Sequence, residues 1–239
     1  LGVNYGLESE PIHLTSDYKN GSFHITLKKG IENLKLYYQI NRGDTLSYDS
    51  IFTISETSNL RAWALKNKRS YGEPIEKVFY KHKGLDARVS KLNSYSQSYM
   101  SDGDISVING LRGGDNFRDG FWQGYFGLDF QAIFAFDSIQ RIDTVISSFY
   151  QYSLSWIFMP KRIVVYTSID GESYYKRAIF EPRVSDNIDG QFFQEFVLTF
   201  PEVEAKFIKF KAYNYGECPD WHPAAGSNSW LFIDEVRIL

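Results

Sequence analysis

The sequence predicts an all-β protein, and three observations favour that class. Aromatic residues make up 17% of the 239 residues, and aromatic side chains fit pleated, half-buried sheet surfaces. Short segments alternate apolar and polar residues with a period of two, which places one face of each segment in a core. Turn-forming glycine pairs separate these segments, and no helical period persists beyond a turn or two. We therefore expect sheets joined by short turns.

The first half reads as a small β-sandwich. Phe23, Ile25 and Leu27 alternate with polar residues, and residues 34–38 and 60–64 repeat this pattern. Turn signals at residues 20–21, 29–30, 42–44 and 71–72 separate these segments. Short strands at this spacing are typical of a sandwich.

The second half continues as stronger strands, and its charge differs. Residues 1–84 carry 12 Lys and Arg against 9 Asp and Glu, whereas the remainder carries 14 against 20. Polar residues and a glycine at 81–86 predict a linker, so we place a domain boundary between residues 84 and 85. The strands expected beyond it lie at residues 130–136, 163–166, 196–198, 207–210 and 231–238.

Composition argues against several partners. The net charge is −3 and no run of five like charges occurs, so neither nucleic acid nor an anionic membrane surface is an expected partner. No apolar run approaches the roughly 18 residues of a membrane-spanning helix. Cys218 is the single cysteine, so no intrachain disulfide is possible. A structural zinc site has four Cys or His ligands, so one cysteine and four dispersed histidines argue against a site at Cys218 and His222. The start at Leu1, without a signal segment, suits a fragment of a longer chain.

Two stretches carry a family resemblance. Residues 36–40, 47–52 and 58–64 resemble the small C-terminal domain of bacterial β-hexosaminidases and chitobiases. Residues 109–124, 155–161, 216–219 and 230–235 resemble the discoidin (coagulation factor 5/8 type C, galactose-binding-like) family, with the closest likeness to family 20 glycoside hydrolases of Bacteroidetes. The resemblance implies an Ig-like domain over residues 1–84 and a discoidin jelly-roll sandwich over residues 85–239.

This resemblance also implies a function. The chain would be a non-catalytic accessory region of a β-N-acetylhexosaminidase or chitobiase, partnered by a catalytic domain outside this sequence. The discoidin domain would bind terminal galactose, GalNAc or GlcNAc weakly, without membrane insertion. Such enzymes are expected in the periplasm or at the cell surface, associated with the outer membrane.

Family 20 hydrolysis uses an adjacent Asp-Glu pair, and Asp234-Glu235 is the one such pair in this sequence. It lies within a predicted closing strand, where neighbouring side chains point to opposite faces. The chain also lacks the βα alternation of a catalytic barrel. We therefore expect no catalysis by this pair.

Many discoidin domains bind one structural calcium ion, which requires six to eight oxygen ligands. By resemblance, Asn109 takes the place of an aspartate ligand and Glu235 that of the C-terminal glutamate, while Gly120 replaces a threonine. Asp115 and Asp119 stand nearby and would restore the missing carboxylate. The sequence leaves calcium open against an alternative in which Glu235 accepts backbone N–H groups.

Three loop segments combine aromatic and polar residues in the way that sugar sites require. They are residues 118–123, 150–156 and 219–230. Each tryptophan in them could instead belong to a core, and an exposed role is clearest for Trp221. The candidate carbohydrate-binding residues are Arg118, Asp119, Trp122, Gln123, Gln151, Tyr152, Trp156, Trp221, His222 and Asn228.

Two further interpretations stay open. The sandwiches could be purely structural and pack against the catalytic domain or mediate dimerisation. The chain could also be a free-standing adhesion protein that binds protein or lipid, although the hydrolase-type first domain argues against this.

Overall fold

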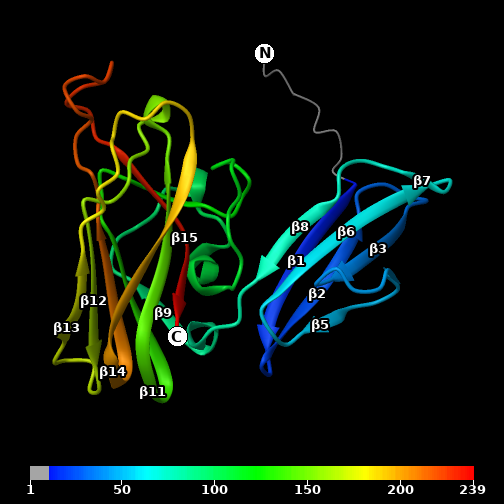
Figure 1. Cartoon of the computed structure of the whole chain (residues 1–239), viewed down its shortest axis with the longest axis horizontal. Helices are drawn as coiled ribbons and strands as arrows, with labels where there is room; N and C mark the ends of the chain where they lie inside the picture. Colours follow the sequence, from blue (N-terminus) through cyan, green and yellow to red (C-terminus); the bar gives the residue numbers. More distant parts are fainter. Residues whose placement is uncertain (1–10) are drawn as a thin grey trace. The chain divides into compact units, whose positions relative to one another are not determined.

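The computed structural model describes residues 11–239 and shows two compact β units, Leu1–Lys81 and His82–Leu239 (Figure 1). Strands joined by turns and loops build both units, and short 3₁₀ helices occur in the second, which confirms the predicted all-β class. No helix among the described residues is long and apolar enough to cross a membrane.

The first unit consists of two antiparallel sheets. One has the strand order β1-β2-β5, and the other has the order β4-β3-β6-β7 with β8 also paired to β6. Their strands are β1 (Ile12–Lys19), β2 (Ser22–Lys29), β3 (Lys35–Ile40), β4 (Leu46–Ser47), β5 (Phe52–Ile54), β6 (Ser58–Lys66), β7 (Arg69–Ser70) and β8 (Ile75–Phe79).

Aromatic contacts join the two sheets of this unit into a sandwich. The ring of Phe23 on β2 lies 5.2 Å from that of Phe79 on β8, and Tyr38 on β3 stacks on Phe52 of β5 at 3.9 Å. On β6, Leu60, Ala62 and Ala64 are buried, and the residues between them face outward. The predicted period-two faces are therefore confirmed here.

The second unit is built on a seven-stranded sheet with the order β10-β15-β11-β14-β12-β13, in which β9 pairs with β11. Four short 3₁₀ helices accompany it: η1 (Lys83–Asp86), η2 (Gln97–Tyr99), η3 (Gly103–Ile108) and η4 (Ser153–Ser155). The strands are β9 (Arg88–Lys91), β10 (Gln123–Phe126), β11 (Phe130–Gln151), β12 (Arg162–Ser168), β13 (Tyr175–Phe180), β14 (Phe192–Tyr213) and β15 (Trp230–Ile238).

Two long paired strands, β11 and β14, run through the whole second unit. Their register is interrupted between residues 135 and 140 and again between 142 and 144 of β11. Before the interruption β11 pairs with β9, and after it β11 pairs with β15. Such irregularities bend strands, so one pair contributes to two layers around a common core of apolar side chains.

The predicted linker at residues 81–86 is wrong from His82 onward. His82 is 6% exposed, and its ring is bonded to Glu235 and to the backbone of Ile238 on β15. Residues 83–86 form η1, which packs on β15 and β11. A polar segment with a glycine can therefore pack on strands of a domain as well as link two domains. The contacts within each unit divide the chain between Lys81 and His82.

Candidate functional site

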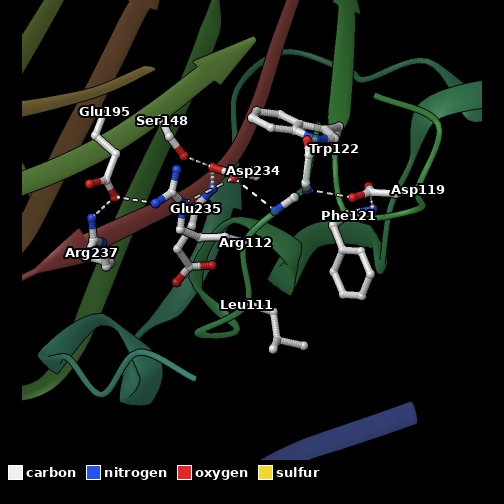
Figure 2. A network of polar contacts seen from close by, with 12 residues as sticks. Leu111, Arg112, Asp119, Phe121, Trp122, Ser148, Glu195, Asp234, Glu235 and Arg237 are labelled. Atoms are coloured by element: carbon white, nitrogen blue, oxygen red, sulfur yellow. Dashed lines mark hydrogen bonds and ion pairs between the residues drawn. The ribbon is translucent and has the colours of Figure 1, made fainter. Parts of the chain in front are cut away.

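A buried polar network surrounds Asp234 and Glu235 on β15 (Figure 2). Both side chains are almost fully buried, because β15 has covered residues on both of its faces. Asp234 accepts hydrogen bonds from the Ser148 hydroxyl and from the Gly113 N–H, at 3.0 Å in the second case. Glu235 Oε1 accepts from the Gly110 N–H at 3.0 Å and contacts His82 Nε2 at 2.8 Å.

Two arginines bring positive charge to this network. Arg112 Nη1 lies 3.0 Å from Glu195 Oε1, and its Nε lies 3.8 Å from Asp234. Arg237 pairs with the same Glu195 carboxylate. These contacts fix the loop at residues 109–114 onto β15, so the Asp-Glu pair is engaged with protein groups and is out of reach of a substrate.

Burial dominates the proton affinities in this network. It raises the pKa of Asp234 to about 7 and that of Glu235 well above its usual value, because a carboxylate loses hydration there. It lowers the pKa of His82 to about 3, assisted by the positive charge of Arg237. Neutral His82 agrees with the geometry: Nδ1 accepts the Ile238 N–H, so Nε2 carries the proton and donates it to Glu235.

Three of the residues expected to ligate calcium, Asn109, Asp119 and Glu235, accept hydrogen bonds from protein N–H groups. Asn109 Oδ1 accepts the Leu111 N–H, and the two carboxylate oxygens of Asp119 accept the N–H groups of Gly114 and Phe121. Within residues 11–239, no group of three or more His, Cys, Asp or Glu side chains is arranged to hold a metal. Glu235 instead accepts an N–H from Gly110, as the alternative interpretation expects.

Two adjoining grooves open beside this network, at the loops that join the strands. The first has a volume of about 470 Å³ and the second about 300 Å³. Tyr99, Phe117 and Arg118 line both of them. The first groove is completed by Ser98, Met100, Ser101, Gly120 and Trp122, and the second by Leu154, Ser155, Trp156, Ile157, Trp230 and Phe232.

Arg118 and Trp156 are the side chains that best suit a ligand in these grooves. Arg118 is exposed, and its guanidinium lies 4.9 Å from the ring centroid of Phe117. Trp156 is 37% exposed, and Leu154 beside it is 71% exposed. An arginine can donate to sugar hydroxyls, while an indole face and an apolar side chain can cover the C–H face of a ring.

The backbone holds Trp156 in an unusual conformation. Its φ is 63°, a left-handed value that is uncommon for a bulky residue. Its N–H donates to the Ser153 carbonyl and its own carbonyl accepts from Trp230, both at 2.7 Å. These two bonds hold the backbone of Trp156, and with it the position of the Cβ that carries the exposed indole. Backbone conformations of this strained kind cluster at functional sites.

Four of the predicted sugar-binding residues are buried, and of these only Trp122 lines one of the two grooves. Trp122 is 1% exposed, packs on Tyr150, and donates to the Gly114 carbonyl at 3.1 Å. Gln123 and Gln151 are buried and hydrogen-bonded, mostly to backbone groups. His222 is also buried and bridges two loops through the Ser153 carbonyl, at 2.8 Å. Their visible roles are structural, because a sugar hydroxyl would have to displace these bonds.

The other predicted residues are partly or fully exposed, and most of them do not line the grooves. Tyr152 is half-buried against Phe117, and the Asp119 carboxylate closes its own turn. Trp221 is 42% exposed but lines neither groove, and Asn228 is exposed beside Gly127. The structure therefore brings Arg118, Tyr152 and Trp156 together around Phe117 and leaves Trp221 outside the grooves.

The candidate residues chosen from the sequence did not include the aromatic groove residues Tyr99, Phe117, Trp230 and Phe232, although Trp230 ends one of the segments singled out. The Tyr99 ring meets those of Trp230 and Phe232 at 5.3 and 4.8 Å. Tyr99 is the last residue of η2, in a serine-rich stretch with no alternating pattern, so no local signal marks it. Phe117 was predictable from the sequence as a site residue, because it directly precedes Arg118. An aromatic and a cationic residue next to each other in a loop are the mixture that a sugar site uses.

Comparisons with known proteins add a fold-level likeness. No protein-family model matches the chain, and no curated protein matches it. Among solved structures, CBM32 of AlyQ in complex with 4,5-unsaturated mannuronic acid is 14% identical. That alignment covers 67% of this chain and 97% of the other, with a TM-score of 0.40.

Two further structures are similar at the same level. CpGH89CBM32-5 from Clostridium perfringens, in complex with GalNAc-β-1,3-galactose, is 10% identical over 65% of this chain and 96% of its own, with a TM-score of 0.43. A putative α-L-fucosidase from Bacteroides thetaiotaomicron is 11% identical over 66% of this chain and 28% of its own, with a TM-score of 0.41. At these values the likeness defines neither a ligand nor a binding residue for this chain.

The fold and the site together define the class of this chain. It is a two-unit β-sandwich protein whose one acidic dyad is buried and whose loops form an open, aromatic groove beside an exposed arginine.

Proposed function

We propose that the second unit binds carbohydrate at the two adjoining grooves, as an accessory region of a glycoside hydrolase. The observation that supports this most is that the exposed Arg118 and Trp156 line one groove together with the buried Phe117. A cationic hydrogen-bond donor and an aromatic face in one open groove suit one sugar terminus. The solved structures described above include modules complexed with sugars, which agrees with this proposal.

The expected ligands are terminal galactose, GalNAc or GlcNAc. An open groove contacts only one side of such a ring, so the affinity should be weak, with a Kd of roughly 0.1–1 mM. The parent enzyme that we propose is a β-N-acetylhexosaminidase or chitobiase of the periplasm or cell surface. This part rests on the sequence resemblance alone.

Calorimetry tests the site directly. Titration of the full chain with GalNAc, GlcNAc and galactose at millimolar concentration should give heat for at least one sugar. Arg118→Ala and Trp156→Ala should each weaken that binding about tenfold, the loss of one good contact. Trp221→Ala is the matched control, because Trp221 is equally exposed but lines neither groove. A loss confined to Trp221→Ala would move the site to the loop at residues 219–228.

A purely structural role is the second candidate, and the outer edge of the sheet favours it. Strand β13 is an edge strand with several exposed large side chains, and β14 adds one more. They are Tyr175, Ile179, Phe180 and Val197, each at least 40% exposed. Exposed apolar side chains on a sheet edge mark interaction surfaces. Sedimentation analysis of the wild type and Tyr175→Ser would show whether this edge mediates dimerisation.

A further inference from the structure

The outward face of a sheet in the first unit carries a second set of aromatic and polar residues. Tyr37 on β3 stands opposite Trp63 on β6, and their rings stack at 6.1 Å with an interplanar angle of 20°. Both are only partly buried. They lie on the face opposite the core residues Leu36 and Ala64, so the packing of the sandwich does not use them.

A groove of about 610 Å³ runs beside this ring pair, across β3, β6 and β8. Register explains its position, because Gln39, Arg61 and Glu76 pair side by side on the three strands. The groove is lined by Gln39, Asn41, Arg42, Asn59, Leu60, Arg61, Glu76, Lys77 and Val78.

Arg61 connects the groove to the rings. Its guanidinium carbon lies 5.9 Å from the Trp63 centroid, and its Nε lies 3.3 Å from Glu76 Oε1. A guanidinium has five N–H donors, so Arg61 can hold Glu76 and lie beside the indole while other donors remain for a ligand.

Hydrogen bonds hold the amide side chains of the groove in place. Asn41 Oδ1 accepts the Asn59 N–H at 2.8 Å, and Asn41 Nδ2 donates to Ser58 Oγ at 3.2 Å. Gln39 Nε2 donates to the Gly43 carbonyl and to Thr45 Oγ1. Amides fixed in this way lose little freedom when a ligand binds.

Charge selects the class of ligand. Arg42 and Arg61 line the groove with one acidic residue, Glu76, so the cations outnumber the carboxylate there although the whole chain has a net charge of −3. Guanidinium groups match carboxylates in geometry as well as in charge. Flat ring faces beside them suit the C–H face of a sugar ring.

From this juxtaposition we propose that the first unit binds an acidic oligosaccharide, one that carries uronate carboxylates, on the groove between Arg42 and the Tyr37–Trp63 pair. The site is separate from the groove of the second unit, and its proposal does not depend on that function. Arg42 meets the carboxylate, and the ring pair supports a neighbouring sugar.

Two similar hairpin turns offer a matched pair of variants. Asn41-Arg42 and Asn67-Lys68 are both asparagine-cation pairs with positive φ, 51° and 58° in the first and 51° and 65° in the second. Arg42 lines the groove, whereas Lys68 does not. Arg42→Ala and Lys68→Ala therefore each remove one exposed cation from a turn position with positive φ, the first in the loop at residues 41–45 and the second in the two-residue turn between β6 and β7.

The experiment is calorimetry of the full chain with trigalacturonate, and with chitotriose as a neutral probe. We expect trigalacturonate to bind at low salt and less tightly at high salt, and any heat from chitotriose, which would arise at the second unit, to be the same in Arg42→Ala as in the wild type. Arg42→Ala should weaken trigalacturonate binding about fivefold, the upper range for one exposed charge contact, and Lys68→Ala should leave it unchanged. Arg61→Gln, a second variant, should also weaken it.

Three outcomes would overturn the proposal: no heat with trigalacturonate at millimolar concentration, equal loss in Arg42→Ala and Lys68→Ala, or loss only in Arg118→Ala. The last outcome places the acidic sugar on the second unit. Conversely, loss of GalNAc binding in Arg118→Ala with trigalacturonate binding intact would separate the two sites. Failure of one proposal is thus distinguishable from failure of the other.

Discussion

Two groups of loop residues in the second unit look alike in the sequence and behave differently in the structure. Trp122 and His222 are buried and hydrogen-bonded, whereas Trp156 and Arg118 are exposed beside the grooves. All four stand in loops with mixed aromatic and polar composition. The difference shows that residue type alone does not assign a loop tryptophan to a ligand; its partners in the fold do. The following predictions test this division.

Trp122→Ala should be the most damaging change in this group. It removes a fully buried indole and its bond to Gly114, so the free energy of unfolding should fall by about 3–5 kcal/mol. Trp156→Ala should stay within about 0.5 kcal/mol, as surface changes do. Urea unfolding of both variants measures this, and equal losses would break the division.

His222→Ala should have the next largest effect. The ring donates to the Ser153 carbonyl and accepts the Ala224 N–H, so its removal leaves buried polar groups without partners. The expected loss is about 1–3 kcal/mol by the same unfolding measurement. Trp221→Ala, the exposed neighbour, is the control and should change stability little.

His82→Gln should alter how stability depends on pH. In the wild type, the pKa of His82 is about 3 in the folded chain and about 6.5 when unfolded, so acidification protonates the unfolded chain only. The free energy of unfolding then falls as pH falls below 6.5, by at most about 1.4 kcal/mol per pH unit.

Asp234 acts in the opposite direction. The pKa of Asp234 is about 7 in the folded chain and 3.8 in the unfolded chain. Its contribution to the free energy of unfolding is therefore lost as the pH rises from 3.8 to about 7. Because His82→Gln removes only the first effect, the variant should lose less stability than the wild type between pH 7 and pH 5. His13→Gln, on an exposed position of the first unit, should follow the wild type. Parallel profiles for His82→Gln and the wild type would contradict the assignment of a neutral His82.

Removal of divalent cations should have the smallest effect. The expected calcium ligands accept protein N–H groups, so EDTA should leave the Tm unchanged. Thermal unfolding with EDTA, with and without added calcium, measures this. A lower Tm in EDTA that calcium restores would show that these ligands rearrange around an ion.

Much of the fold was predictable because it depends on local alternation. Leu60, Ala62 and Ala64 are buried as their period requires, and the long strands β11 and β14 contain the predicted segments. The full length of β11 was less predictable. The predicted segment stops at residue 136, whereas β11 continues through a change of register at residues 135–144 as one bent strand.

The site was only partly predictable, because it is made by residues far apart in the chain. Arg118, Tyr152 and Trp156 were expected and meet around Phe117, but Tyr99 reaches the groove from an unmarked loop. The hydrogen bond between His82 and Glu235 joins residues that are 153 positions apart in the chain. His82 was expected in a linker and Glu235 at a calcium site, but the two form one buried pair. No local sequence pattern predicts which distant residue donates a hydrogen bond to a buried carboxylate.

The left-handed backbone of Trp156 has a consequence for kinetics. Since its N–H and carbonyl are bonded before a ligand arrives, binding at this groove requires no loop closure. Association should then be limited by collision, at about 10⁵–10⁷ M⁻¹s⁻¹, with no slow phase. With the proposed Kd of roughly 0.1–1 mM, dissociation would take place within about 0.1 s or faster. A chain that released each sugar terminus so quickly would move from one to the next, and it would hold a polymer only where several termini are close together.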